Sequence, residues 1–231
     1  MKAKKNFIII GGGTLCPGDL PVNRRESDLL AAADAGYRAL LNAGQQPDLL
    51  IGDFDSLDPS EAGSFTGEII RLPVEKDDTD SIYCIKTGFA RGYKDFLLYG
   101  MLGGGRISHT FANVQLLSYV KQNGGNAVLA AGDTRIFCAA AGEQVIINAL
   151  NEKQMTPYET GHSGNISIFS LSDEACVSLE NLYYPGDRLI LHRSFPLGVS
   201  NHLKDLPAKI KIHSGDILVI SEGYKGIDLY L

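Results

Sequence analysis

The sequence predicts an N-terminal α/β domain with a mostly parallel, doubly wound sheet, followed by an all-β sandwich domain. Up to about residue 140, apolar runs typical of buried strands alternate with segments of helical periodicity, as in a sheet that helices cover on both faces. Beyond that point the long helical patterns stop, and short β-type runs follow, separated by Gly, Asn, Asp and Pro. We therefore predict two domains, 1–140 and 141–231.

The individual elements follow from local patterns. In the best-defined helix, Ile82, Ile85 and Phe89 share one face, and Asp78 or Thr79 can cap its start. The expected strands of the first domain are 7–10, 29–33, 49–51, 68–72, 96–99 and 127–131, and its expected helices are 37–43, 59–65, 79–93 and about 109–122. The expected strands of the second domain are 145–147, 166–169, 189–191, 210–212 and 217–220.

Composition limits the function. A chain of 231 residues with 44% hydrophobic residues and a net charge of −6 lacks the basic character of a general nucleic-acid binder. A nucleotide substrate remains compatible with this charge, because a bound metal ion can invert the local field. The four cysteines are scattered, which favours free thiols in a reducing compartment, and the apolar run 7–10 is too short to cross a membrane. We expect a cytoplasmic protein that binds neither nucleic acid nor membranes.

Acidic residues gather where the strands of the first domain end. In an open α/β sheet, ligands bind beyond the carboxyl ends of the strands, and right-handed connections bring these ends to one edge. Carboxylates crowded at one edge repel one another unless a cation joins them, and Mg²⁺ prefers such oxygen ligands. The acidic residues concerned are Asp34 after the second strand, Asp53 and Asp55 after the third, and Asp77, Asp78 and Asp80 after the fourth.

Each acidic segment also has a simpler interpretation when it is taken alone. Asp53 and Asp55 can belong to a polar turn, and Asp34 can close one. One of the three acidic residues before the helix 79–93 can serve only as a cap or as a favourable charge at the helix start. The combination of segments at one edge, rather than any single one, favours a magnesium site.

Two glycine runs also follow strands. Gly11 to Gly13 match neither the dinucleotide-binding fingerprint nor a P-loop and are a weak signal. Gly103 to Gly105 precede Arg106, and a guanidinium beside backbone N–H groups suits phosphate oxygens, although the glycines alone can form a simple turn. His109 is either a residue of the helix start or a phosphate contact.

Several of these segments together resemble the thiamine pyrophosphokinase family. The resemblance rests on G-D-F-D-S at 52–56, K-D-D-T-D at 76–80 and G-G-R-I-S-H-T-F-A-N at 104–113, supported by A-D-A-G at 33–36, P-D at 47–48 and G-V-S-N at 198–201. The segments occur in both halves of the chain, in order and at suitable separations. A joint match of this kind is far more specific than a lone D-x-D.

The resemblance implies a magnesium-dependent thiamine diphosphokinase, a homodimer with active sites at the subunit interface. Its reaction transfers pyrophosphate from the co-substrate ATP to the hydroxyl of thiamine, giving AMP and thiamine diphosphate. The roles we predict from it are as follows: Asp53, Asp55 and Asp80 hold Mg²⁺; Asp34, Asp77, Thr79, Arg106 and His109 line the nucleotide side; Ser200 and Asn201 line the thiamine side; Asp53, Asp55, Asp77 and Arg106 are catalytic, with Asp77 a candidate general base.

Two positions depart from the family pattern. Ser108 stands where the family has aspartate, and serine substitutes well if that position only caps the following helix. If the aspartate contacts substrate, the change removes a charge and weakens or alters activity. Ala35 is a milder departure, because it stands where the family has the less restricted glycine.

Other functions are weighed against this one. The first is a metal-dependent D-x-D phosphatase of the haloacid-dehalogenase type, which needs its acidic pair on the first strand. The second is a metal-dependent glycosyltransferase, which leaves Gly104, Gly105 and Arg106 unexplained. The third, from a different class, is a non-catalytic nucleotide or thiamine sensor in which Ser108 marks lost chemistry; binding of both ligands without turnover would identify it.

Overall fold

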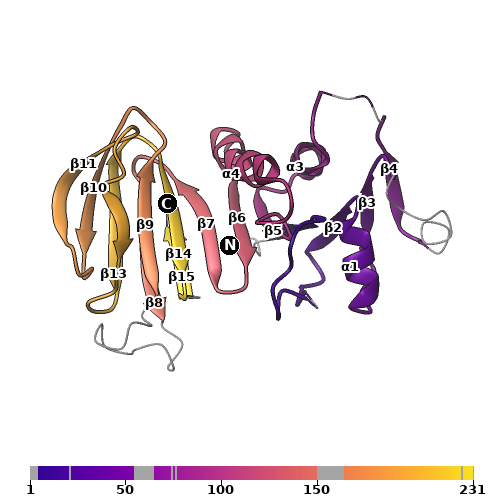
Figure 1. The fold of residues 1–231 in the computed structure, drawn as a ribbon, viewed down its shortest axis with the longest axis horizontal. Helices are drawn as coiled ribbons and strands as arrows, with labels where there is room; N and C mark the ends of the chain where they lie inside the picture. The colour runs from indigo at the N-terminus through magenta and orange to yellow at the C-terminus, as the bar shows by residue number, and fades with distance from the viewer. Residues whose placement is uncertain are drawn as a thin grey trace. The chain divides into compact units, whose positions relative to one another are not determined.

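A computed structural model of the chain describes residues 5–20, 22–54, 65–73, 75, 77–149, 164–224 and 226–230 (Figure 1). Contacts between Cα atoms divide the chain into two compact units, Met1–Gly132 and Asp133–Leu231. The boundary predicted from the sequence, after residue 140, and the roles given to the two domains stay predictions. Of the predicted helix 59–65, only Phe65 lies among the described residues.

The first unit contains a parallel sheet, as predicted. Its strands pair in parallel in the order β6-β5-β1-β2-β3-β4. The strands are β1 (Asn6–Ile10), β2 (Leu29–Ala33), β3 (Leu49–Gly52), β4 (Glu68–Arg71), β5 (Asp95–Tyr99) and β6 (Asn126–Ala131), and the helices are α1 (Gly36–Asn42), α3 (Asp80–Ala90) and α4 (Ile107–Gln122). All six predicted strands and three of the four predicted helices are confirmed.

Helices cover both faces of this sheet, because alternate residues of a strand point to opposite sides. On one face, Ile8 and Ile10 of β1 pack in a cluster with Tyr37 and Leu40 of α1. On the other face, the Phe96 ring of β5 lies 5.0 Å, centroid to centroid, from the Phe89 ring of α3. The sheet is therefore doubly wound.

The close packing of α3 depends on glycine. A Cβ atom on Gly88 would lie 2.4 Å from the Phe96 ring and 3.1 Å from the Phe7 ring, both closer than ordinary carbon contacts. The missing side chain lets the helix backbone approach these rings. The approach sets the position of α3 over the sheet, and with it the position of the helix start at Asp80.

The second unit is built from antiparallel strands, which confirms the predicted all-β fold. One group of strands pairs in the order β12-β9-β14-β7 and the other in the order β11-β10-β13-β8-β15. The strands are β7 (Thr134–Ala139), β8 (Gln144–Ala149), β9 (Asn165–Ser170), β10 (Glu174–Glu180), β11 (Gly186–His192), β12 (Gly198–Asn201), β13 (Ala208–Ser214), β14 (Ile217–Glu222) and β15 (Gly226–Tyr230).

The core of the second unit follows the period of two expected for half-buried strands. Ile210 and Ile212 of β13 are buried whereas Lys211 between them is exposed. In β9 the alternation is incomplete, because Ser167 is buried as well as its neighbours Ile166 and Ile168. Over the described part of the chain, no helix is both long and apolar enough to span a bilayer.

Candidate active site

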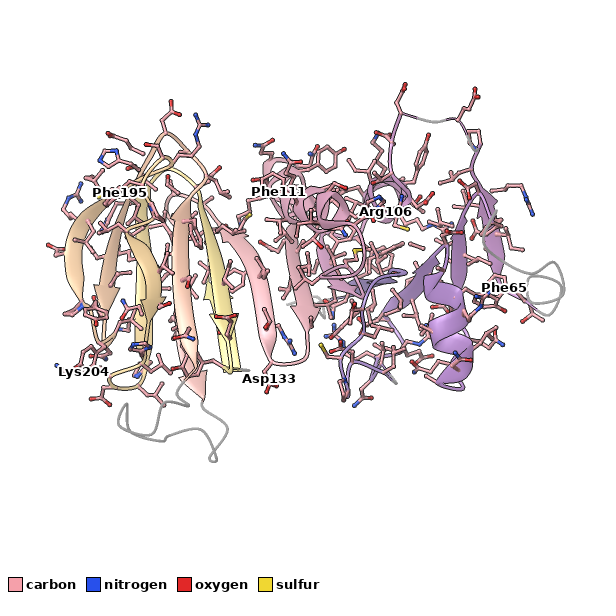
Figure 2. The ribbon with its side chains drawn as sticks, viewed as in Figure 1. Phe65, Arg106, Phe111, Asp133, Phe195 and Lys204 are labelled. Atoms are coloured by element: carbon pink, nitrogen blue, oxygen red, sulfur yellow. The ribbon has the colours of Figure 1, made fainter. Side chains whose placement is uncertain are left out.

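A pocket of about 750 Å³ opens at the carboxyl ends of the strands in the first unit. It lies where parallel α/β sheets bind their ligands. Figure 2 labels Arg106, which contributes to the pocket from the start of α4. The lining residues are Gly11, Gly12, Gly13, Ala33, Asp34, Ala35, Asp53, Asp78, Thr79, Asp80, Ser81, Gly100, Met101, Gly103, Gly104, Gly105, Arg106, His109 and Asn113.

Part of the lining is bare backbone. The segments that follow β1 and β5 stay paired with each other. Gly11 N–H donates to Tyr99 O at 2.8 Å, and Gly13 N–H donates to Gly100 O at 2.7 Å. A Cβ atom on Gly13 would lie 2.6 Å from Gly100 O, so a side chain does not fit there. The glycine run that was a weak signal in the sequence thus has a steric reason.

Asp34 and Asp53 reach the pocket from neighbouring strands. Asp34 adopts a left-handed backbone (φ 45°), and its N–H donates to Ile51 O of β3 at 2.9 Å. A Cβ atom on Gly52 would lie 3.2 Å from Asp34 Oδ1, closer than most real contacts. Gly52 therefore gives the Asp34 carboxylate room beside the backbone that leads into Asp53.

The neighbouring turn also explains the departure at Ala35. Ala35 has right-handed angles (φ −59°, ψ −14°), which alanine adopts without strain. The glycine that the backbone requires is Gly36, where a Cβ atom would lie 2.0 Å from Ile10 O. Alanine at position 35 is therefore compatible with this turn.

The start of α3 brings further polar groups to the pocket. Thr79 is the N-cap, and its hydroxyl accepts a hydrogen bond from Ile82 N–H at 3.4 Å, which decides between the two predicted caps. Asp80, in the first turn, lies one turn before Cys84. Burial, and next the nearby charge of Asp80, raise the pKa of the Cys84 thiol well above its usual value, so this thiol is not a reactive one.

Asp77 and Asp78 differ in position. Asp77, the predicted general base, is exposed and is not a lining residue of the pocket, so its catalytic role stays a prediction. Asp78 does line the pocket, and its carboxylate forms an ion pair with Lys86 of α3. The hydrogen bond to Asp78 is the main reason that the pKa of Lys86 is raised. The sequence analysis counted Asp78 among the acidic residues of this edge and as a candidate cap, but assigned it no role in the site.

The start of α4 corrects the prediction for Ser108. The helix begins at Ile107, with Arg106 as the N-cap residue, and not at His109. Ser108 is therefore inside the first turn, exposed and not a lining residue, and the idea that it caps this helix is wrong. His109 does line the pocket. The sequence analysis also overlooked Asn113, a lining residue one turn further along the same helix.

Of the other predicted site residues, two belong to the second unit and one lies outside the described part of the chain. Asp55 lies outside the described residues. Ser200 and Asn201 are on β12 of the second unit, and neither is a lining residue of the pocket. The side-chain amide of Asn201 pairs with Tyr184, accepting from its N–H at 3.0 Å and donating to its carbonyl at 2.9 Å. Ser200 is exposed and left-handed (φ 58°).

The donors in the pocket suit a magnesium ion. Asp53 and Asp80 line the same pocket, and Mg²⁺ is commonly bound by one or two carboxylates together with water and substrate phosphates. Within the described residues, no three His, Cys, Asp or Glu side chains are grouped so that they could hold a metal by themselves. Asp53 and Asp80 fit an ion that completes its coordination with substrate and water.

Residues 23–129 match the family model "Thiamin pyrophosphokinase, catalytic domain". The matched stretch includes the acidic residues of the pocket, the glycine loop that contains Gly103 to Gly105, and Arg106. This stretch is a thiamin pyrophosphokinase catalytic domain. The glycine-rich loop 11–13 precedes the matched part of the domain.

The similarity to solved structures covers nearly the whole chain and not only the matched catalytic domain. A thiamine pyrophosphokinase from Bacillus subtilis is 24% identical, with a TM-score of 0.80 over 95% of this chain and 99% of that one. A thiamin pyrophosphokinase family protein from Enterococcus faecalis is 24% identical, with a TM-score of 0.76 over 96% and 100%. The enzyme from Candida albicans is 17% identical, with a TM-score of 0.77 over 95% and 89%. At these identities the likeness concerns the fold. A search of curated proteins found no match.

Proposed function

We propose that this protein is a thiamine pyrophosphokinase that transfers the pyrophosphoryl group of ATP to the hydroxyl of thiamine, giving AMP and thiamine diphosphate, with Mg²⁺ bound. The observation that carries the proposal is the pocket itself, where acidic residues, a glycine loop and an arginine meet within a thiamin pyrophosphokinase catalytic domain. A D-x-D phosphatase of the type considered above is disfavoured, because Asp53 follows the third strand and not the first.

In the proposed reaction, Arg106 and the backbone of the glycine loop bind the phosphate oxygens of ATP. A guanidinium offers paired donors, and its positive charge offsets the negative charge that develops on the transferred group. Asp34, Asp77, Thr79 and His109 are assigned to the nucleotide side. The thiamine hydroxyl attacks the β-phosphorus in line while AMP leaves, so the pocket mainly has to hold both substrates in that alignment.

Asp53, Asp55 and Asp80 are proposed to hold Mg²⁺. When bound, the ion neutralises charge on the phosphate oxygens and helps to orient them. Several acidic side chains around one pocket also favour an incoming cation electrostatically. We retain Asp77 as a candidate for the general base, although it does not line the pocket, because binding of substrates can rearrange a loop that precedes a helix.

The thiamine side is proposed to include β12 of the second unit. Ser200 offers a hydroxyl there, and Asn201 acts through Tyr184, whose backbone it holds. The Tyr184 ring lies 5.3 Å from the Tyr183 ring and 6.3 Å from the His202 ring, measured between centroids. Aromatic faces attract cations, which suits the positively charged thiazolium ring of thiamine.

We also propose a cytoplasmic homodimer with active sites at the subunit interface. Each unit exposes large apolar side chains of the kind that interfaces cover. In the first unit, Ile107 and Phe111 of α4 are 80% and 68% exposed beside the pocket residue Arg106. In the second unit, Tyr183 and Tyr184 are 52% and 58% exposed beside β12. Equilibrium sedimentation tests the dimer.

The experiment that tests the proposed reaction is incubation of the purified protein with ATP, Mg²⁺ and thiamine, followed by chromatography of the products. We expect AMP and thiamine diphosphate in equal amounts, with neither formed when thiamine or Mg²⁺ is omitted. Formation of ADP or free phosphate in place of AMP would refute pyrophosphoryl transfer. Binding of both substrates without any product would identify the sensor considered above.

A further inference from the structure

Two side chains of α4 hold carbonyl groups of the glycine loop, residues 101–105, beside the pocket. Thr110 Oγ1 donates to Gly103 O at 3.3 Å, and Asn113 Nδ2 donates to Met101 O at 2.9 Å. Met101 and Gly103 line the pocket, as does Asn113, whereas Thr110 is not a lining residue. The helix therefore contacts the loop through one residue at the pocket and one outside it.

The target of the Thr110 hydroxyl is unusual for a helical threonine. Inside a helix, a threonine hydroxyl commonly bonds to the carbonyl of the preceding turn. Here the hydroxyl reaches a carbonyl seven residues earlier, outside α4, and the Asn113 amide reaches one twelve residues earlier. Both side chains thus stabilise the shape of the loop instead of the helix.

The loop needs such support because its own sequence gives little. Gly103 and Gly104 have φ values of 70° and 94°, and a Cβ atom on Gly104 or Gly105 would meet nothing within 4 Å. Glycines in open surroundings lose much conformational entropy when they are ordered. Two hydrogen bonds from a packed helix restrict the loop before any ligand arrives.

The direction of the Met101 and Gly103 carbonyl groups also affects how the loop interacts with an anion. Carbonyl oxygens carry partial negative charge and would repel phosphate oxygens if they turned toward them. While Met101 O and Gly103 O accept from α4, they cannot turn toward a phosphate without breaking these bonds. The arrangement favours binding of an anion at a loop that otherwise could present either its N–H or its C=O groups.

We propose that Thr110 and Asn113 are positioning residues, which fix the glycine loop in the form that binds the phosphates of a nucleotide. The identity of the nucleotide as ATP rests on the function proposed above; the fixing of the loop does not. Both residues belong to the segment 104–113 that carries the family resemblance, but the sequence analysis gave neither of them a role. Thr110 gives the cleaner test, because it is not a lining residue and a change there leaves the pocket wall intact.

The test compares Thr110→Val, which keeps the shape and removes the donor, with Thr110→Ser, which keeps the donor. For each protein we would measure the KM for ATP, the KM for thiamine, the Kd for a non-hydrolysable ATP analogue with Mg²⁺, and the melting temperature. Loss of one hydrogen bond should weaken nucleotide binding by about three- to tenfold in Thr110→Val. Thr110→Ser should stay within about twofold of the unchanged protein. The KM for thiamine and the melting temperature should hardly change in either.

Asn113→Leu supplies a second variant, and the combined change Thr110→Val with Asn113→Leu should weaken binding of the analogue more than either change alone. The proposal is overturned if Thr110→Val binds the analogue as tightly as Thr110→Ser does. It is also overturned if Thr110→Val raises both KM values equally while the melting temperature falls, because that result indicates a general structural role.

The binding measurement separates this proposal from the proposed reaction. A protein that binds the analogue but forms no thiamine diphosphate would refute the reaction, and the comparison of Kd values would still decide the role of Thr110. A protein that binds neither the analogue nor inorganic pyrophosphate would overturn the positioning role itself, because the loop would then have no phosphate to receive.

Discussion

Two clusters of polar side chains, one in each unit, both include aspartate but are arranged differently. In the first unit, Asp34, Asp53 and Asp80 converge on a pocket of about 750 Å³ together with Arg106. In the second unit, a serine, an aspartate and a histidine lie side by side on adjacent strands, and their polar atoms bond to one another. The first cluster lines a pocket. In the second cluster, the polar atoms form hydrogen bonds with one another.

The second cluster consists of Ser178 on β10, Asp187 on β11 and His213 on β13. Ser178 Oγ lies 2.6 Å from Asp187 Oδ1 and 2.7 Å from His213 Nε2, and it accepts from Arg188 N–H at 3.1 Å. If the Asp187 carboxylate is ionised it can only accept, so the single hydroxyl proton of Ser178 goes to Asp187, and the tautomer of His213 that completes the set carries its proton on Nε2. A nucleophile would instead give its proton to the histidine. In this arrangement the trio links three strands instead of activating Ser178.

The comparison shows that residue types do not identify a site by themselves. Serine, histidine and aspartate within hydrogen-bonding distance are a structural link where each is satisfied by the others. Several carboxylates around one pocket repel one another and destabilise the fold unless a cation or another ligand is bound. Such a cluster is therefore a stronger indication of function than the hydrogen-bonded trio.

The largest expected effect comes from the same substitution made in each cluster. Asp53→Asn removes a charge from the pocket and should lower the rate of AMP formation by about a hundredfold or more. Asp187→Asn makes the identical chemical change in the second cluster and should leave that rate within about twofold. Both rates are measured with saturating substrates. An Asp53→Asn protein with normal activity would refute the assignment of Asp53 to the metal.

A smaller effect is expected from Gly52→Ala. The new Cβ atom would lie 3.2 Å from Asp34 Oδ1, so the Asp34 carboxylate must shift by a few tenths of an ångström. Such a displacement in a site of this kind should lower turnover by about tenfold, because catalysis depends strongly on the positions of the reacting groups. Steady-state kinetics test this, with circular dichroism to verify the fold. Normal turnover would show that the position of Asp34 is not critical.

For the second cluster we expect loss of stability without loss of activity. Ser178→Ala removes a largely buried hydroxyl that three groups share, which should lower the free energy of unfolding by about 1–3 kcal/mol. The activity of the folded protein should not change. Urea unfolding and a turnover assay below the transition measure the two quantities. A variant of normal stability but reduced turnover would contradict a purely structural role.

The smallest effect concerns the pH dependence of stability that comes from Asp28 of the first unit, whose carboxylate is fully hydrogen-bonded. Burial raises the pKa of Asp28, but hydrogen bonds from the Arg25 side chain and from the backbone N–H groups of Asn6 and Arg25 outweigh burial and lower it overall. A lowered pKa stabilises the folded protein above the pKa of the unfolded chain, and this contribution is lost as the pH falls through the folded value. The stability difference between the unchanged protein and Asp28→Asn should therefore shrink below about pH 4. A difference that is independent of pH would contradict this.

Much of the first unit could be predicted, because strands β1, β2 and β3 are buried almost throughout and their sequences are continuous apolar runs. The edge strand β4 is mostly exposed, and its signal is correspondingly shorter. Strands of the second unit were harder to detect. In β10, buried Ala175, Cys176 and Ser178 are too small or polar to give a strong signal, and the strand depends on its partners β11 and β13. The short strand β12 likewise depends on tertiary pairing, with Asn201 bonded to Tyr184.

The candidate site was predictable to the level of strand ends but not of single residues. Asp34, Asp53, Asp80, Arg106 and His109 do line one pocket. Which of two adjacent aspartates enters the pocket, Asp77 or Asp78, depends on the backbone just before α3, and no sequence pattern specifies that direction. The place of Ser108 depends on where α4 starts, which is Ile107 and not His109.

The central claim is that this pocket transfers a pyrophosphoryl group, and isotopic labelling tests it most directly. With ATP labelled in its γ-phosphate, the label should appear in thiamine diphosphate, and AMP should be unlabelled. With ATP labelled in its α-phosphate, the label should appear only in AMP. Label from the γ-phosphate in thiamine monophosphate, together with ADP, would show phosphoryl transfer and contradict the claim.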